Sequence, residues 1–560
     1  MFTTYQTMTN TLGNRHMKFR LTSVLYTLLI ALFFTAIQNI ALWQHITELF
    51  EANPPNSPIF AISIPIFICA ALNIIFTLLI WPKVYRVLIP VLIILSALAT
   101  YGMYSYGIFF DYGMIVNIFE TNTGEATSYL SLGGGLWLLA IGIIPAIIFT
   151  AMKVQFKPFF KELLSKFGSI VISLLVIGLI AAGYYKDYAS LVRNHSEIKA
   201  LINPTNYLSA TYRYAQYQLI EAKMPFKHIG TDAVNEHAAI TAKTGKPNVV
   251  VMVLGEASRS MNYSLNGYDR DTNPELSKLN VISFKDVKSC GTATAASVPC
   301  MFSDMTKANY NPMTARHQDG VLDVMHHAGI DVLWKDNDGG CKGACDRIKH
   351  VEMSAEIDPS LCHNDSCYDQ ILLKGLQQYI DDAKQDTFIV LHVIGSHGPT
   401  YDDRYPEKFK VFTPTCDTSD LQNCTQQQVK NTYDNTIVYT DYILSQVIDM
   451  LKKDDHHANT AMFYMADHGE SLGEDGVYLH GLPYAIAPKE QTTVPLILWL
   501  SPEYQKSQHI NRACLEKEAQ AGGYSQDNLF HSLLGMMDVK TKVYEPKLDI
   551  FSQCRSISAH

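Results

Sequence analysis

Long apolar runs divide the chain into two regions. Within its first third, five runs are each about as long as a helix that crosses the roughly 30 Å of hydrocarbon in a bilayer. They are residues 21–43, 58–81, 86–108, 136–152 and 167–184. Beyond residue 245 the apolar residues come in shorter runs between polar segments. We therefore predict a transmembrane domain of five helices over 1–185 and a separate folded domain over 246–560.

Lys and Arg residues lie in alternate loops of the first region. They occur before the first run and in the turns after the second and fourth runs, whereas the loops after the first and third runs contain none. Because cytoplasmic loops are enriched in Lys and Arg, the odd number of runs predicts a C-terminal domain outside the cytoplasm. A cleaved signal peptide is the alternative for the first run, but the run is longer than the apolar core of such a peptide.

The segment 186–245 between the two regions is too polar to span a membrane. Tyrosines alternate with polar residues over 207–220, which is typical of an amphipathic helix at the level of the lipid headgroups. We predict interfacial linker helices here, with a solvent-exposed connector helix as the alternative.

Four continuous apolar runs predict strands in the C-terminal domain. They cover 249–254, 387–394, 460–466 and 494–500. Continuous runs suit strands that are buried on both faces, so we expect a parallel sheet in an α/β domain. The intervening segments 369–384 and 429–453 are predicted helices.

Ten of the eleven cysteines fall in the domain predicted to be exported, and Cys69 lies within the second apolar run. An even number of cysteines in an oxidising compartment indicates disulfides. Their spacing suggests five pairs: Cys290 with Cys300, Cys341 with Cys345, Cys362 with Cys367, Cys416 with Cys424, and Cys514 with Cys554. A zinc ribbon built from the two close pairs between 341 and 367 is the alternative.

Carboxylates and imidazoles follow three of the predicted strands. Glu256 follows the first strand, His397 the second, and Asp467 with His468 the third. Ligands gather at the carboxyl ends of the strands in open α/β sheets, so these groups are expected at one edge. Oxygen and nitrogen ligands of this kind indicate a divalent metal site, with zinc as the expected ion.

Three hydroxyls lie between Cys290 and Cys300 and are candidate nucleophiles, namely Thr292, Thr294 and Ser297. A hydroxyl becomes a useful nucleophile when a metal ion lowers its pKa. Thr and Ser also favour the N-cap of a helix, and a helix that starts near Ala293 is the alternative role. The two roles are compatible, because a helix N-terminus attracts a phosphate.

Five motifs of the chain resemble those of the lipid A phosphoethanolamine transferases, the family that includes the mobile colistin-resistance enzymes. They are GEASR at 255–259, CGTAT at 290–294, GSHGPTY at 395–401, ADHGE at 466–470 and YLHG at 478–481. The resemblance extends over nearly the whole chain. It implies a five-helix transmembrane domain in a Gram-negative inner membrane. This domain would be followed by an α/β alkaline-phosphatase-like domain of the sulfatase type on the periplasmic side.

The resemblance also implies roles for individual residues. Thr294 would be the nucleophile, and one zinc ion would be bound by Glu256, Thr294, Asp467 and His468. His397 and His480 correspond to histidines that serve the substrate phosphate, proton transfer or a second zinc ion.

Further residues correspond to contacts with the donor. Lys342 would contact the donor phosphate. Asn117, Thr121 and Glu125 correspond to residues that hold phosphoethanolamine, and their spacing of four would place them on one face of a helix.

The expected reaction is therefore the transfer of phosphoethanolamine from phosphatidylethanolamine to a phosphate of lipid A, in two steps through a covalent Thr294 adduct. A core sugar or a periplasmic glucan is the alternative acceptor, and a lipoteichoic-acid-synthase-like glycerophosphotransferase is an alternative activity. A sulfatase is disfavoured because neither Cys290 nor Cys300 stands in a C-x-P-x-R setting.

Two other classes are disfavoured as well. A transporter would need charged residues in the core of its spans, and the apolar runs have none there. An inactive relative would have lost at least one of the metal-ligand residues. The net charge of -9 argues against a nucleic-acid partner. We expect lipids as the partners of a monomeric chain.

Overall fold

A computed structural model of the protein describes residues 21–555, apart from residues 53, 56, 122–125, 127, 128, 130, 222, 364 and 365. The chain forms two compact units. The first comprises Met1–Tyr101 and Leu136–Pro204, and the second comprises Gly102–Gly135 and Thr205–His560. The division of the chain into 1–185, 186–245 and 246–560 stays a prediction.

Long apolar helices make up most of the first unit. Among the described residues, four helical stretches are long and apolar enough to cross a membrane, and a bent pair of helices raises the number to five. The four are α3 (Pro58–Leu79), α4 (Tyr85–Tyr106), the stretch Leu132–Ala151 that joins α7 (Leu132–Trp137), η2 (Leu138–Ile143) and α8 (Ile144–Ala151), and α9 (Phe159–Asn194).

The first predicted span is a broken helix. It consists of α1 (Ser23–Phe33), a π-helical turn η1 (Phe34–Gln38) and α2 (Ile40–Ala52), and its two halves meet at 57°. The break falls at Asn39, whose side-chain amide donates to Phe34 O at 2.9 Å and to Asn203 O at 3.1 Å. These side-chain bonds replace regular helical bonds at the bend, and insertions of this kind are a known cause of sharp kinks.

Helix α9 begins at Phe159, several residues before the predicted start at 167. Its first turns contain charged residues, which a hydropathy pattern does not assign to a membrane-spanning run. Glu162 accepts a hydrogen bond from Lys157 N at 2.8 Å, and the Lys166 ammonium donates to Thr77 O at 2.9 Å. Both side chains are buried, so local hydrogen bonds let the helix extend beyond its apolar run.

A seven-stranded sheet is the centre of the second unit. Its strand order is β5-β14-β11-β4-β10-β6-β7. The bounds are Ile282–Lys288 (β5), Thr493–Leu500 (β14), Asn459–Ala466 (β11), Asn248–Gly255 (β4), Thr387–His392 (β10), Asp331–Asp336 (β6) and Lys349–Glu352 (β7). All four predicted strands are present.

The prediction of a purely parallel sheet is wrong at β14. This strand pairs antiparallel with β11 on one side and with β5 on the other. The chain does not cross over between β11 and β14. It makes a short hairpin of β12 (Ser471–Glu474) and β13 (Val477–Leu479) and re-enters the sheet beside the end that it left, so β14 must run in the opposite direction.

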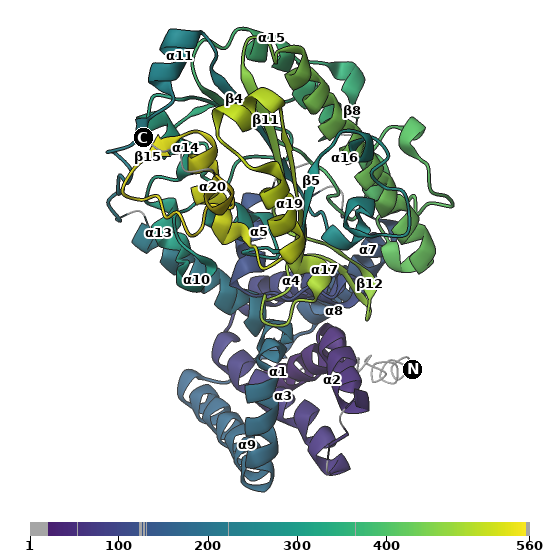
Figure 1. The fold of residues 1–560 in the computed structure, drawn as a ribbon. Helices are drawn as coiled ribbons and strands as arrows, with labels where there is room; N and C mark the ends of the chain where they lie inside the picture. The colour runs from purple at the N-terminus through teal and green to yellow at the C-terminus, as the bar shows by residue number, and fades with distance from the viewer. Residues whose placement is uncertain are drawn as a thin grey trace, which may run out of the picture. The chain divides into compact units, whose positions relative to one another are not determined.

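Helices cover both faces of the sheet. Val250, Met252 and Leu254 of β4 share one core with α14 (Val321–His327), α19 (Arg512–Ala521) and α20 (Leu529–Met536). Helix α16 (Gln426–Lys453) contacts β11, and it lies across the sheet from α19 and α20 in Figure 1. This burial on both faces explains why the central strands are continuous apolar runs.

The other predicted helices are confirmed in part. Residues 429–453 lie within α16, and residues 207–220 lie within α10 (Thr205–Glu221). The segment 369–384 instead divides into a 3₁₀ turn η9 (Asp369–Leu373) and a short α15 (Leu376–Asp381). Gly375 separates them with a φ of 70°, a left-handed conformation that glycine adopts readily.

All five suggested disulfides are present, joining Cys290 to Cys300, Cys341 to Cys345, Cys362 to Cys367, Cys416 to Cys424 and Cys514 to Cys554. The zinc-ribbon alternative is thereby excluded, since its four sulfurs are bonded in pairs. Within the described residues Cys69 is the free cysteine.

These disulfides should differ in their contribution to stability. The Cys514–Cys554 bond closes a loop of 40 residues and the Cys362–Cys367 bond a loop of 5. Chain-entropy arguments give about 4 kcal/mol for the long loop and about 2 kcal/mol for the short one. Replacing both cysteines of the long loop by Ser should therefore lower the thermal unfolding midpoint of the full-length protein further than the same change in the short loop. Equal shifts would contradict the prediction.

Candidate active site

The carboxyl ends of three adjacent strands bring the predicted site residues together. Strands β11, β4 and β10 are parallel neighbours, and Gly255 at the end of β4 pairs with Ala466 while Leu254 pairs with His392. The segments that follow therefore leave the sheet at one edge. Glu256, Asp467 and His468 follow directly and are fully buried, and His397 is nearly so.

Close backbone packing at this edge requires a glycine. Gly395 lies against the backbone of Glu256 with a φ of 50°, and a Cβ at this position would be only 2.8 Å from Glu256 O. A larger residue would push the two strand ends apart. The first glycine of the GSHGPTY motif is thus explained by its packing beside Glu256.

Thr294 is the hydroxyl that faces these strand ends. Its Oγ1 donates to Glu256 Oε2 at 3.0 Å and lies 3.4 Å from His468 Nε2. Thr294 is also the first residue of helix α12 (Thr294–Met301), with Ala293 at the N-cap. The helix predicted to start near Ala293 is confirmed, and it points its N-terminus at the site.

The other two hydroxyls of the segment have structural roles. Thr292 Oγ1 donates to Leu482 O at 2.6 Å, and Ser297 Oγ accepts from Gly291 N at 2.9 Å. Both bonds fix the loop that leads into α12. Geometry therefore selects Thr294 among the three candidates.

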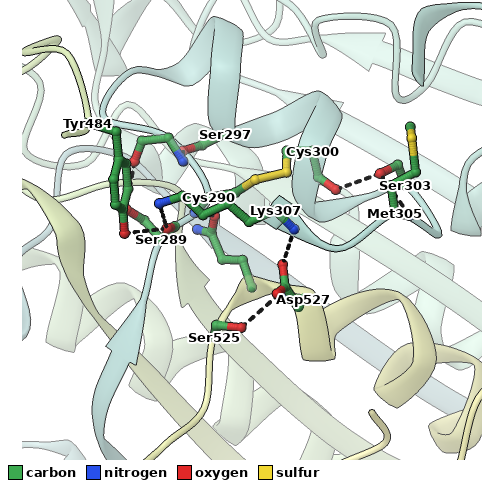
Figure 2. Close-up of a disulfide and its surroundings, with 12 residues drawn as sticks. Ser289, Cys290, Ser297, Cys300, Ser303, Met305, Lys307, Tyr484, Ser525 and Asp527 are labelled. Carbon is green, nitrogen blue, oxygen red and sulfur yellow. Dashed lines mark hydrogen bonds between the residues drawn. A yellow bond between two sulfur atoms is a disulfide. The ribbon is translucent and has the colours of Figure 1, made fainter. Parts of the chain in front are cut away.

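The loop that carries Thr294 is fastened to the C-terminal part of the chain. Figure 2 shows the Cys290–Cys300 disulfide beside the turn at 525–528, where the Asp527 carboxylate accepts from Lys307 N at 2.7 Å. Next to it, Gln526 Oε1 accepts from Cys290 N at 2.6 Å. The Gln526 amide also donates to Ala466 O at 2.9 Å and to Asp467 O at 2.6 Å. One buried side chain thus joins the loop that carries Thr294 to the strand end that carries Asp467.

The buried carboxylates and His468 fit a divalent cation. His468 Nδ1 donates to Gly469 O at 2.9 Å, which leaves Nε2 facing Glu256 at 3.4 Å and Asp467 at 3.3 Å. Asp467 Oδ1 accepts two backbone N–H bonds, whereas its Oδ2 is buried and accepts none. Two carboxylates without access to water need a cation nearby, and this oxygen and nitrogen set suits zinc.

His397 and His480 lie next to this cluster. The His480 ring is 4.3 Å from the His468 ring and 5.5 Å from the His397 ring, centre to centre. An imidazole nitrogen of each histidine lies within 4.8 Å of a Glu256 oxygen and of the other histidine's nitrogen. Both rings are therefore within reach of a group bound at Thr294.

Glu470 orients His480 and was not among the predicted site residues. Its Oε2 bonds to His480 Nδ1 at 2.8 Å, and its Oε1 accepts from the Tyr401 hydroxyl at 2.6 Å. Burial raises the pKa of the Glu470 carboxyl to about 7. Its place in the ADHGE motif was a usable signal, whereas Gln526 stands in no recognisable motif.

Helix α5 (Tyr112–Glu120) carries Asn117, one of the predicted donor-contact residues, and belongs to the same compact unit as the sheet. Helix α5 contacts α12. Its last residue, Glu120, accepts from the Lys342 ammonium through its backbone oxygen at 3.2 Å and from Arg316 through its side chain at 2.6 Å. Lys342 is thereby placed beside the end of the helix that carries Asn117.

Asn117 and Thr121 were expected on one face of a helix, but Thr121 is not helical. Helix α5 ends at Glu120, and Thr121 is extended, with φ −69° and ψ 151°. Glu125 lies outside the described residues. The roles of Asn117, Thr121 and Glu125 stay predictions.

Comparison with known proteins identifies the family. Residues 247–539 match the sulfatase family model, and residues 68–219 match the model described as phosphoethanolamine transferase EptA/EptB. Phosphoethanolamine transferase EptA of Escherichia coli K12 is 45% identical over 95% of this chain and 97% of its own. The chain belongs to the phosphoethanolamine transferase family.

Two further proteins extend the comparison of this transferase. Phosphatidylethanolamine transferase Mcr-1 of Escherichia coli is 35% identical and covers 84% of this chain and 88% of its own. The integral membrane lipooligosaccharide phosphoethanolamine transferase A of Neisseria meningitidis superposes with a TM-score of 0.92 at 35% identity, and the match covers 96% of this chain and 99% of that one.

These matches confirm the predicted architecture and location. The transferase has a membrane-spanning domain and an α/β domain of the sulfatase and alkaline phosphatase type. It is an inner-membrane protein, and its catalytic domain lies in the periplasm, as does the matching domain of a Campylobacter jejuni transferase that is 43% identical.

Gln526 provides a test of how the transferase positions the loop that carries Thr294. Gln526→Glu removes both N–H donors and sets a carboxylate against two carbonyl oxygens, so we expect turnover to fall by about 10- to 100-fold, the range seen for residues that orient metal ligands. The measurement is kcat for phosphoethanolamine transfer, with KM changing little.

Gln505→Glu is the matched control. Gln505 donates to Leu500 O at 2.9 Å, at the opposite edge of the sheet, and this variant should retain normal turnover. If both variants lost activity equally, the positioning role of Gln526 would be refuted.

Proposed function

We propose that this transferase moves phosphoethanolamine from phosphatidylethanolamine to a phosphate of lipid A. The observation that carries the proposal is the Thr294 hydroxyl at the start of α12, bonded to Glu256 and facing His468. An alcohol held beside buried carboxylates and a helix N-terminus is suited to accept a phosphoryl group.

The names of relatives support the two substrates. Mcr-1 is named for phosphatidylethanolamine, and other relatives are named as Kdo(2)-lipid A phosphoethanolamine 7''-transferases. A membrane-embedded donor also suits a catalytic domain that is linked to membrane-spanning helices. A sugar of the inner core is the second candidate acceptor, because the Kdo(2)-lipid A enzymes share this fold family.

In the first step the Thr294 oxygen forms a bond to the phosphorus of the donor. The bond from phosphorus to the glycerol oxygen breaks, and diacylglycerol leaves after that oxygen takes a proton from His397 or His480. Glu256, which accepts the hydrogen bond of the Thr294 hydroxyl, takes the hydroxyl proton as the new bond to phosphorus forms. Phosphoethanolamine then remains as an ester on Thr294.

In the second step a phosphate oxygen of lipid A attacks the same phosphorus. The Thr294 ester bond breaks, and the Thr294 oxygen takes back the proton held by Glu256. The proton of the attacking phosphate passes to the histidine that protonated diacylglycerol, and lipid A gains a positively charged amine. The N-terminus of α12 stabilises the negative phosphoryl oxygens in both steps.

A zinc ion fits the group of Glu256, Thr294, Asp467 and His468. When bound, it would lower the pKa of the Thr294 hydroxyl and stabilise charge on the phosphoryl oxygens. His397 and His480 contribute proton transfer, and Glu470 fixes the orientation of His480 through the 2.8 Å bond. Lys342 would supply a positive charge for the donor phosphate.

Thr294 is tested by trapping its ester. The full-length enzyme incubated with phosphatidylethanolamine alone should gain one phosphoethanolamine group, and peptide mass spectrometry should place it on Thr294. Thr294→Ala should lower transfer by about 1000-fold or more, as loss of a nucleophile does. Thr294→Ser should retain part of the activity because the hydroxyl survives.

Thr292→Ala is the control for that experiment. Its hydroxyl bonds to Leu482 O rather than to the strand ends, so the variant should keep most of its activity and still form the adduct. An adduct mapped to Thr292 or Ser297, or normal transfer by Thr294→Ala, would contradict the two-step mechanism.

The metal is tested by depletion and return. Chelator treatment should abolish transfer, and zinc should restore it. Asp467→Asn removes a buried ligand charge, so we expect it to lower transfer by about 100-fold or more and to weaken zinc binding measured by calorimetry. Full activity in metal-depleted enzyme would contradict this assignment.

A further inference from the structure

Two histidines and an aspartate converge on the outside of the catalytic domain, in a group that the proposed transfer reaction does not use. His228 Nδ1 lies 3.1 Å from Asp319 Oδ2, and His327 Nε2 lies 3.0 Å from the same oxygen. The three ligand atoms all lie within 4.8 Å of one another. The histidine side chains are 62% and 28% exposed, whereas that of Asp319 is 1% exposed. The cluster therefore has a buried anionic base and an open side.

Backbone hydrogen bonds fix this arrangement before any ligand arrives. The segment that carries His228 is tied to the segment that carries Asp319 by Lys227 N donating to His317 O at 2.7 Å and Asp319 N donating to Lys227 O at 3.1 Å. Ile229 N also donates to Asp319 Oδ2 at 3.0 Å. His327 is the last residue of helix α14, which packs in the domain core. Three elements thus hold the three side chains.

The spacing of the three ligand atoms, all within 4.8 Å of one another, suits a metal site. Zinc binds imidazole nitrogen at about 2.0–2.1 Å and carboxylate oxygen at about 2.0–2.2 Å, which sets neighbouring ligand atoms about 3.4 Å apart. The observed separations of 3.1 and 3.0 Å need only a small outward movement of each ring. The exposed side of His228 leaves the fourth position to water, as in many sites with three protein ligands.

The charge around the cluster favours a cation. Arg347 is a positive group close to Asp319, but it makes its hydrogen bonds to the Asp323 carboxylate, at 3.0 and 2.6 Å. Its Nε lies 3.7 Å from Asp319 Oδ1, the oxygen that faces away from the histidines. The two carboxylates of Asp319 and Asp323 carry one more negative charge than the Arg347 guanidinium neutralises. Arg347 orients Asp319 from behind, as groups outside the ligand set commonly do in metal sites.

We propose that His228, Asp319 and His327 form an accessory site for a divalent transition metal of the zinc type. Both imidazoles bind in the neutral form, and the metal takes the place of the protons that now lie between the rings and Asp319 Oδ2. The site joins the segment that enters the catalytic domain to helix α14. It is separate from the proposed catalytic metal, because it shares no residue with Glu256, Thr294, Asp467 or His468.

The test counts zinc in the full-length protein. Purified enzyme is equilibrated with zinc alone, excess metal is removed, and zinc per polypeptide is measured by mass spectrometry. We expect His228→Ala with His327→Ala to bind one equivalent less than the parent, while phosphoethanolamine transfer is unchanged. Asp467→Asn should lose a different equivalent, so the combined variant should lose two. Failure of the catalytic-metal assignment would affect only the Asp467 arm.

His326→Ala is the matched control, because His326 lies on the same helix, is exposed, and is adjacent in sequence to His327. It should bind as much zinc as the parent. His228→Ala alone, a change at an exposed side chain, should also lose the equivalent without loss of folding. Equal zinc content in the parent and the double variant would overturn the proposal, as would an equal loss in His326→Ala.

Discussion

Two carboxylates buried side by side are the constraint on which the active site depends. Glu256 and Asp467 end neighbouring strands and have no contact with solvent. Their negative charges repel each other at low dielectric, so the arrangement is stable only with compensating groups. Backbone N–H groups of Ala257 and His468 bond to Asp467, Thr294 donates to Glu256, and the His468 ring faces both. The same groups that relieve the repulsion build a place for a cation and a nucleophile.

The position of Thr294, the candidate nucleophile, depends on parts of the chain that are far apart in sequence. Thr294 stands on a loop that the Cys290–Cys300 disulfide closes, and Gln526 ties that loop to the end of β11. Both restraints act on the backbone, so the Thr294 side chain remains available for chemistry. Strand β14 lies between β11 and β5 and runs away from the site, and helix α19, which contacts β5, leads the chain back to Gln526.

The sequence predicted what depends on local pattern and failed where distant residues decide. The strands could be predicted because buried strands are apolar runs. The convergence of Glu256, Asp467 and His468 could be predicted because these polar residues directly follow such runs. Five disulfides followed from spacing, since four of the pairs are close neighbours. The antiparallel direction of β14 could not be predicted, because a continuous apolar run is the same pattern for a parallel and an antiparallel strand. The bend at Asn39 depends on its bond to Asn203, 164 residues away. Gln526 itself stands in no motif, although the carbonyls that it contacts belong to one.

The loop after the third apolar run contacts the helix that begins at Thr294, which hydropathy does not predict. By composition it is a loop of the membrane region, yet residues 102–135 belong to the compact unit of the sheet. Within it, α5 packs on α12, the helix that begins at Thr294, and Glu120 joins it to Lys342 and Arg316. A lipid headgroup held by this segment would therefore move together with the nucleophile. Because these contacts lie within one compact unit, they hold the end of α5 close to the start of α12.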